Sequence, residues 1–173
     1  MLNYLPIIIP ILILVITGLF IVKQQTAVII ERFGKFQSIR QAGLKLKIPL
    51  VDKIAGRISL KIQQLDVNVE TKTKDDVFVH LNIAVQFEIQ RDHVYNAFYK
   101  LQNPHEQITA FIFDTVRAEV PKMKLDDVFV KKDEIARAIQ RDLKEAMLNY
   151  GYDIVKALVT DIDPDENVKI AMN

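Results

Sequence analysis

The sequence predicts an α+β protein, an antiparallel meander sheet with packed helices, preceded by one N-terminal transmembrane helix. Three patterns predict this class. Residues 77–90 alternate apolar and polar side chains, which is typical of a strand with one buried face. Residues 5–22 carry no charge and are almost wholly apolar. After residue 90 the apolar residues recur at helical spacing instead.

The stretch 77–90 is the least ambiguous element of the chain. Its odd positions are all large and apolar: Val77, Val79, Leu81, Ile83, Val85, Phe87 and Ile89. A helix would scatter these side chains around its circumference, whereas a strand puts them on one face. Burying them is worth roughly 10–20 kcal/mol before chain entropy is subtracted. We therefore predict the central strand of the sheet here, with a polar face that is free to pack against a neighbour.

Composition excludes several classes of function. The 173 residues are 50% hydrophobic, which is enough for one domain with a proper core. The formal net charge is only +1, so no nucleic-acid partner is expected. The chain has no cysteine, which excludes disulfides, thiolate nucleophiles and cysteine-based zinc sites.

Residues 5–22 predict a membrane anchor. Eighteen helical residues span about 27 Å, close to the roughly 30 Å hydrocarbon core of a bilayer. A cleaved signal peptide would need a basic n-region and a small-residue cleavage site, and the sequence has neither. The residues expected to contact lipid are Leu5, Ile9, Ile13, Ile16, Phe20 and Val22.

The anchor leaves two geometries open. Pro6 suits a first helical turn, but Pro10 lies deeper and kinks the helix or marks its outer end, so a re-entrant hairpin is the alternative to a single span. No Lys or Arg precedes the anchor. Basic residues follow it: Lys23, Arg32, Lys35, Arg40, Lys45 and Lys47. The positive-inside rule then predicts a single-pass protein with its soluble part in the cytoplasm.

Two β segments follow the anchor. Residues 25–36 predict a β segment that is broken at Gly34. Residues 44–48 alternate aliphatic side chains with Lys45 and Lys47, and Pro49 ends this strand or puts it at an edge. One interpretation is an ordinary strand with a solvated lysine face. The other is that Lys23, Lys45 and Lys47 contact anionic lipid headgroups.

The alternation changes phase between residues 58 and 70. Apolar side chains occupy even positions up to Ile62 and odd positions from Leu65. A one-residue slip would turn every later side chain to the wrong face, so we predict a β-bulge or a sharp bend at Gln63 and Gln64. The polar turn 71–76 then leads into the central strand. The expected meander covers residues 26–90.

Three helices, a strand and the start of a fourth helix are expected after residue 90. Residues 91–101 have helical spacing. A second helix has Asn103 as its N-cap, with Pro104 first and Glu106 third in a capping box, and ends near residue 119 before Pro121.

The third helix covers about residues 131–150, and Gly151 supplies the left-handed residue that follows it. Residues 152–162 predict a returning strand. Pro164 then starts a further helix that reaches Asn173.

No catalytic, cofactor or metal site emerges from the residues, so an enzyme is not expected. The three histidines, His80, His93 and His105, lack metal-ligand spacing, and we expect them on the surface or on a strand face. Ser38 and Ser59 lie in no G-x-S-x-G context. Asp161, Asp163 and Asp165 imitate the start of an EF-hand loop. Glu166 at the sixth position and Met172 at the twelfth rule that loop out, so these acids are expected to end a strand and cap the next helix.

Several motifs occur in an order that resembles one family. They are V-I-I-E-R-F-G-K-F (28–36), G-L-K-L-K-I-P-L-V-D (43–52), L-D-V (65–67), T-K-D-D-V (73–77), L-D-D-V-F (125–129), Y-G-Y-D-I (150–154) and D-I-D-P-D-E-N-V-K-I-A-M-N (161–173). Together they resemble the SPFH or band 7 family, which holds stomatins, prohibitins and flotillins. The last two motifs are most similar to the stomatin-like and plant hypersensitive-induced-reaction branch.

The resemblance implies an SPFH domain that lies against the membrane and binds membrane lipids, with no catalytic residues and no cofactor. It also implies homo-oligomers shaped as rings or cages that organise membrane microdomains, and clients such as channels or membrane proteases. Relatives continue past Asn173 into a long charged helix, so a truncated helix is expected at 166–173. Certain relatives place the domain on the extracytoplasmic side, which stays open as the alternative orientation.

The expected organisation is an anchor at 1–22, the SPFH domain at 23–165 and the start of a C-terminal helix at 166–173. Within the domain, residues 23–90 are mainly β and residues 91–165 mainly α with the returning strand. The expected function is that of a membrane-anchored, non-enzymatic scaffold. An accessory regulator bound to a membrane protease or channel is the alternative, and a soluble lipid-binding module is a third hypothesis.

Overall fold

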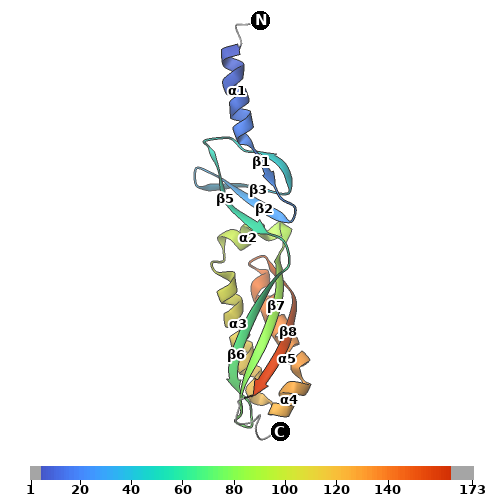
Figure 1. The fold of residues 1–173 in the computed structure, drawn as a ribbon. Helices are drawn as coiled ribbons and strands as arrows, with labels where there is room; N and C mark the ends of the chain where they lie inside the picture. The colour runs from blue at the N-terminus through green and yellow to red at the C-terminus, as the bar shows by residue number, and fades with distance from the viewer. Residues whose placement is uncertain (1–4, 165–173) are drawn as a thin grey trace. The chain divides into compact units, whose positions relative to one another are not determined.

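The structure is a computed structural model that describes residues 5–164 (Figure 1). In the first helix, the side chains of residues 5–8, 10, 11 and 13 lie outside the description. The chain forms two compact units that divide between Lys61 and Ile62.

The first unit consists of one helix and five short strands. Its elements are α1 (Leu5–Gly18), β1 (Leu19–Val22), β2 (Thr26–Arg32), β3 (Lys35–Arg40), β4 (Gly43–Leu46) and β5 (Asp52–Ser59). Three strands form an antiparallel sheet in the order β3-β2-β5, and β1 pairs with β4 in a separate two-stranded ribbon. The core of this unit contains Val22, Val28 and Ile30, with Phe20 and Ile54 packed against them.

The predicted break at Gly34 is a hairpin turn between β2 and β3. Arg32 pairs with Lys35, so Phe33 and Gly34 form a two-residue turn, and both have positive φ values (51° and 77°). Such turns match the twist of the flanking strands, and glycine is the residue that adopts positive φ most readily.

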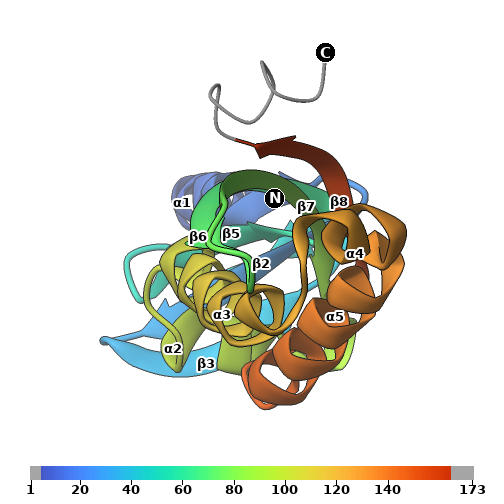
Figure 2. The ribbon, with the colours of Figure 1, turned by 90° about the horizontal axis from the view of Figure 1, so that it is seen from below.

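The second unit packs helices on one side of a three-stranded sheet. Its elements are β6 (Gln63–Lys72), β7 (Phe78–Ile89), η2 (Arg91–His93), α2 (Val94–Tyr99), α3 (Pro104–Glu119), η3 (Val120–Lys122), α4 (Leu125–Val130), α5 (Lys132–Leu148) and β8 (Tyr152–Pro164). The strand order is β6-β7-β8, with both pairings antiparallel. Figure 2 shows α3 and α5 on the same side of this sheet.

The core of the second unit lies between β7 and these two helices. The odd positions of β7 from Val79 to Ile89 are buried. The helices on this side of the sheet (Figure 2) contribute Ile108, Ile112 and Val116 from α3, and Ile135, Ile139, Leu143 and Met147 from α5, all fully buried. The α+β class and the central strand are confirmed.

The single meander over residues 26–90 is wrong. The strands up to Ser59 belong to the first unit, and β6 starts a separate sheet at Gln63. The phase change marks the connection between the two units, where the chain bends at Lys61, just before the predicted position. The alternative prediction, a bulge at Gln63 and Gln64, is wrong. The register of β6 with β7 is unbroken from Gln63 to Lys72, whereas the β7–β8 pairing carries two irregularities, at Asn82/Ile83 and Gln86/Phe87.

The helices after residue 90 occur where they were predicted, with α3 covering Pro104–Glu119 and Gly151 at φ 84° after α5. The capping box is wrong. Asn103 has a left-handed backbone (φ 53°) in place of the extended N-cap conformation, and its amide donates to Glu106 Oε2 at 3.3 Å. The short helix α4 was not predicted, because its six residues are too few for a periodic signal.

The N-terminal helix is shorter than predicted. It ends at Gly18, and Leu19–Val22 form β1, so the prediction of a helix through Val22 is wrong. Among the residues described, no helix combines the length and the apolar character needed to cross a membrane.

At the other end, Pro164 closes β8 and does not start a helix. The helix expected at 166–173 lies outside the described residues. The predicted domain boundaries at 22 and 165 stay predictions.

Candidate functional site

The ribbon of β1 and β4 exposes its aliphatic side chains. Leu19 pairs with Leu46, and Ile21 pairs with Leu44. Directly opposed residues lie on the same face, and these four side chains are 43–69% exposed. We call these four residues the aliphatic face. A Leu or Ile side chain gains about 1.5–3 kcal/mol when it leaves water, so this surface is suited to contact with an apolar partner.

The other face of the ribbon packs onto the protein. Val22 is only 2% exposed and belongs to the core with Val28 and Ile30. Lys45 is opposite Phe20, and both are half-buried. The prediction of a solvated lysine face on β4 is therefore wrong. Lys45 lies on the same face of the ribbon as Phe20 and Val22, which faces the protein, and Leu44 and Leu46 lie on the exposed face.

Helix α1 extends the apolar surface. Ile9, Leu12, Leu14, Val15 and Ile16 are all exposed, and the segment carries no charged residue. Among the predicted anchor residues, Ile9 and Ile16 are thus exposed on the helix. The side chains of Leu5 and Ile13 lie outside the described part of α1. Phe20 and Val22 lie on β1, facing away from the aliphatic face.

Gly18 joins the helix to the ribbon. Its carbonyl accepts a hydrogen bond from the Lys47 backbone N–H at 2.9 Å. A Cβ at Gly18 would lie 2.5 Å from the Lys47 carbonyl oxygen and 3.1 Å from Leu46 Cδ1. Only glycine lets the end of β4 pass this close, so the end of α1 is fixed against the ribbon.

An ion pair fixes the loop that follows the ribbon. The Asp52 carboxylate accepts from Arg32 Nε at 2.8 Å and from the Ile48 backbone N–H at 2.9 Å. The hydrogen bond from Arg32, followed by that from Ile48, holds the pKa of Asp52 below its usual range. This carboxylate ties the ends of β2 and β5 to the segment that carries Ile48.

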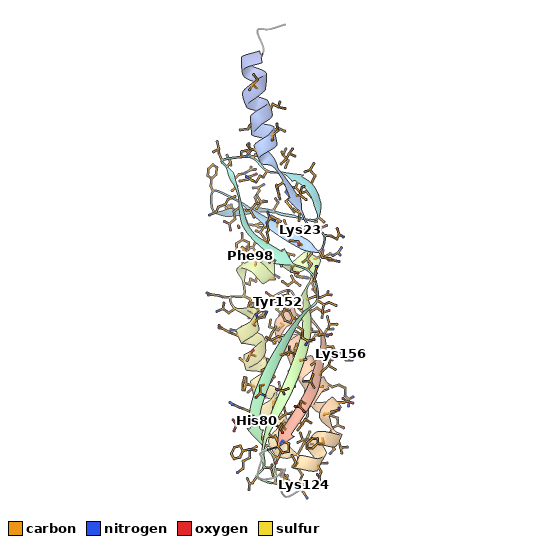
Figure 3. The ribbon with its side chains drawn as sticks, viewed as in Figure 1. Lys23, His80, Phe98, Lys124, Tyr152 and Lys156 are labelled. Carbon is orange, nitrogen blue, oxygen red and sulfur yellow. The ribbon has the colours of Figure 1, made fainter. Side chains whose placement is uncertain are left out.

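The three predicted headgroup lysines do not form one row. Lys23 follows β1 at the end away from α1 and is exposed (Figure 3). Lys45 lies on the inner face of the ribbon, and Lys47 lies beside Gly18. The structure places Lys45 and Lys47 near the aliphatic residues and leaves Lys23 at the far end of β1.

Sequence reasoning missed two further apolar residues of this unit. Leu50 is 98% exposed at φ 68°, and Phe33 is 84% exposed in the β2–β3 turn. Large apolar side chains at left-handed turn positions are unusual in water. The missed signal was a bulky apolar residue at each turn, after Pro49 and before Gly34.

Across residues 5–164, no group of three or more His, Asp or Glu side chains is arranged to hold a metal ion. His80 lies on β7, His93 in η2 and His105 in α3, where its ring contacts Phe87 edge-on at 5.8 Å. Ser38 and Ser59 lie on β3 and β5. Asp161 and Asp163 are within β8, opposite Asn82 and His80, and Asp165 lies outside the described residues.

Comparison with protein families matches residues 20–173 to the SPFH domain / Band 7 family. The chain belongs to this family. Its similarity to two named relatives agrees with the stomatin-like and hypersensitive-induced-reaction branch. Hypersensitive-induced response protein 4 of Arabidopsis thaliana is 44% identical over 153 residues, which cover 88% of this chain and 52% of the relative. Mitochondrial stomatin-like protein 2 of Homo sapiens is 29% identical over 159 residues, which cover 90% of this chain and 44% of the relative.

This SPFH chain spans about half the length of the curated relatives it matches. Two of its motifs contact each other in the second unit. The Asp75 carboxylate, in T-K-D-D-V, accepts from the backbone N–H of Leu125, the first residue of L-D-D-V-F, at 3.1 Å. The Thr73 hydroxyl also donates to Asp75 at 2.6 Å, and it is the main cause of the lowered pKa of Asp75. These motif residues join the β6–β7 turn to α4, so their role here is structural.

Proposed function

We propose that this SPFH protein is a membrane-anchored, non-enzymatic scaffold. The observation that carries the proposal is the inverted ribbon, in which four aliphatic side chains point outward while Lys45 points inward. An apolar face of this kind is stable where water is absent, and it continues the exposed aliphatic side chains of α1. The first unit then enters the bilayer, with α1 as its anchor.

The lysines and the orientation complete the proposal. Lys47 reaches anionic headgroups at the edge of the apolar surface, and Lys23 does so at the far end of β1. The half-buried Lys45 reaches them only through its long side chain, which starts on the inner face of the ribbon. Each charge close to such a surface contributes about 1 kcal/mol. The excess of basic residues after the anchor places the second unit on the cytoplasmic side of a single-pass protein. Copies pack laterally into homo-oligomers that organise membrane microdomains or client membrane proteins.

Tryptophan fluorescence tests the membrane part, because the chain has no natural tryptophan. Ile21→Trp puts one fluorophore on the aliphatic face, and Phe78→Trp puts one on an exposed apolar position of β7, 49% exposed, as the matched control. In vesicles of brominated phosphatidylcholine and phosphatidylglycerol, we expect strong quenching at residue 21 and little at residue 78. Equal quenching of both, or of neither, would contradict contact between the ribbon and the bilayer.

The alternative, an accessory regulator bound to a membrane protease or channel, also has an observation in its favour. Val130 is 81% exposed and the neighbouring Phe129 is 40% exposed at the junction of α4 and α5, which gives the second unit an apolar surface for a client. Crosslinking in cells distinguishes the two functions. A ladder of self-adducts supports the scaffold, and a single adduct with a foreign protein supports the regulator.

A further inference from the structure

A small apolar notch lies at the junction of α1 with the end of β4. Six residues line it: Leu14, Val15, Leu46, Lys47, Ile48 and Pro49. Its volume is about 130 Å³. An apolar cavity of about 150 Å³ binds a benzene-sized ligand, so this notch has room for a short stretch of hydrocarbon.

The backbone keeps the notch in shape. Leu14 and Val15 come from the last turn of α1, and the segment of Ile48 and Pro49 follows β4. The Lys47 N–H to Gly18 carbonyl bond holds the two sides together, and the absence of a side chain at Gly18 allows the approach. Asp52 fixes the far side by accepting the Ile48 N–H. Two hydrogen bonds and the close approach at Gly18 therefore define the two walls of the notch.

The chemistry of the lining indicates the occupant. Five of the six lining residues are aliphatic or proline, and Lys47 is the one charged residue among them. Because a lysine ammonium group lies at the end of a flexible stem, an apolar slot with one lysine in its wall suits a molecule with a hydrocarbon chain and one negative charge. Among the ligands present where we propose the ribbon lies, a phospholipid has both features.

From this geometry we infer that the notch binds one acyl chain of an anionic phospholipid, whose phosphate pairs with the Lys47 ammonium group. The inference rests on the proposed membrane contact of the first unit and goes beyond it. Membrane contact by the aliphatic face requires only a fluid bilayer, whereas the notch holds one lipid at a fixed position.

Photocrosslinking tests the inference with the full chain. The probe is phosphatidylglycerol with a diazirine in its acyl chain, added as a tracer to vesicles of phosphatidylcholine and phosphatidylglycerol. We expect the adducts to concentrate on residues 14, 15 and 46–49. Val15→Trp fills the notch and should reduce these adducts about tenfold, the loss expected when about two buried methylene groups lose their contacts.

Two matched variants separate the notch from general exposure to lipid. Leu12→Trp adds the same side chain to an exposed position of α1 outside the notch, and it should leave the adducts at 46–49 unchanged. Lys47→Gln should keep the adducts but remove the preference for the phosphatidylglycerol tracer over a phosphatidylcholine tracer. Vesicle flotation is measured for every variant and should stay the same.

The outcomes distinguish this inference from the proposed function. If the protein floats with vesicles but adducts spread evenly over Leu12, Ile16 and Ile21, the notch is not a lipid site and the membrane proposal stands. If the unmodified protein does not float, both fail. If Val15→Trp leaves the adducts at residues 46–49 unchanged while the protein still floats, the lipid does not occupy the notch and the lipid assignment is overturned.

Discussion

Strand β4 of the ribbon and the central strand β7 both alternate apolar and polar side chains, but opposite kinds of side chain are exposed. In β7 the odd, apolar side chains are buried, and the polar side chains of the even positions form the outer face. In the ribbon the aliphatic side chains are exposed, while a lysine and a phenylalanine face the protein. The difference arises from what covers each face. Helices α3 and α5 cover the apolar face of β7, and no element of the described chain covers the aliphatic face of the ribbon.

An alternation of period two predicts a strand, but it does not determine which face of the strand is exposed to water. In β7 the alternation also predicts which face is buried, because helices of the same chain cover the apolar face. The aliphatic face of the ribbon is exposed in the described chain, and we propose that its partner is the bilayer.

The strongest test places the same charge on both regions. Ile83→Asp puts a carboxylate where the side chain is 1% exposed, and we expect a loss of more than about 4 kcal/mol, enough to unfold the second unit. Ile21→Asp makes the same change at a 69% exposed position, and we expect the folding free energy to change by about 0.5 kcal/mol or less. Circular dichroism and amide hydrogen exchange in mild detergent measure both effects.

The assignment of Ile21 to an exposed face would be contradicted if Ile21→Asp destabilised the first unit as strongly as Ile83→Asp destabilises the second. The aliphatic face would then be part of a core. The folding measurement in detergent is independent of vesicle binding, so a loss of membrane contact by Ile21→Asp does not interfere with it.

Much of the second unit could be predicted from the sequence, because its signals are local. The alternation of 77–90 fixed β7, and the pair of Pro104 and Pro121 bracketed α3. A left-handed glycine was expected after the third helix, and Gly151 has that conformation. The capping box was wrong because the backbone angle of Asn103 depends on the loop before α3 and not on the residue type alone.

The candidate site could not be predicted in the same way, because it depends on contacts between distant segments. Leu19 and the three residues after it are as apolar as the helix before them, so composition does not reveal where α1 ends. The end is set by Gly18, whose role appears only when Lys47 lies against it. The outward direction of Leu44 is likewise decided by the packing of Val22 onto β2.

A smaller effect is expected from the ion pair that fixes the loop after the ribbon. The pKa of Asp52 is lowered in the folded protein, so the unfolded chain binds its proton more readily. The stabilisation is therefore present above the ordinary carboxyl pKa of about 4 and is lost as the pH falls below it. We expect Asp52→Asn to lower hydrogen-exchange protection of β2 and β5 at neutral pH and to flatten its decrease below about pH 4.

The matched control is Asp66→Asn, which removes an exposed carboxylate of β6 in the second unit. It should leave the protection of β2 and β5 unchanged at every pH. If the Asp52→Asn variant still lost the hydrogen-exchange protection of β2 and β5 below about pH 4, another group would be responsible for that loss. The hydrogen bond from the Ile48 N–H would then not depend on the charge of Asp52.

The smallest effect is expected on the polar face of β7, and it completes the comparison within one strand. The Gln86 amide donates to Gln64 Oε1 at 3.3 Å on the outer face, while the preceding residue, Val85, is fully buried. We expect Gln86→Ala to change the free energy of unfolding by less than about 0.5 kcal/mol, and Val85→Ala to lower it by about 2 kcal/mol. Urea denaturation of both variants measures the two changes in the free energy of unfolding. The two positions are neighbours on the same strand, so the backbone is the same in both tests. A large effect of Gln86→Ala would show that the outer face of β7 packs against a partner. The second unit would then also have a face that requires a partner, as we propose for the ribbon.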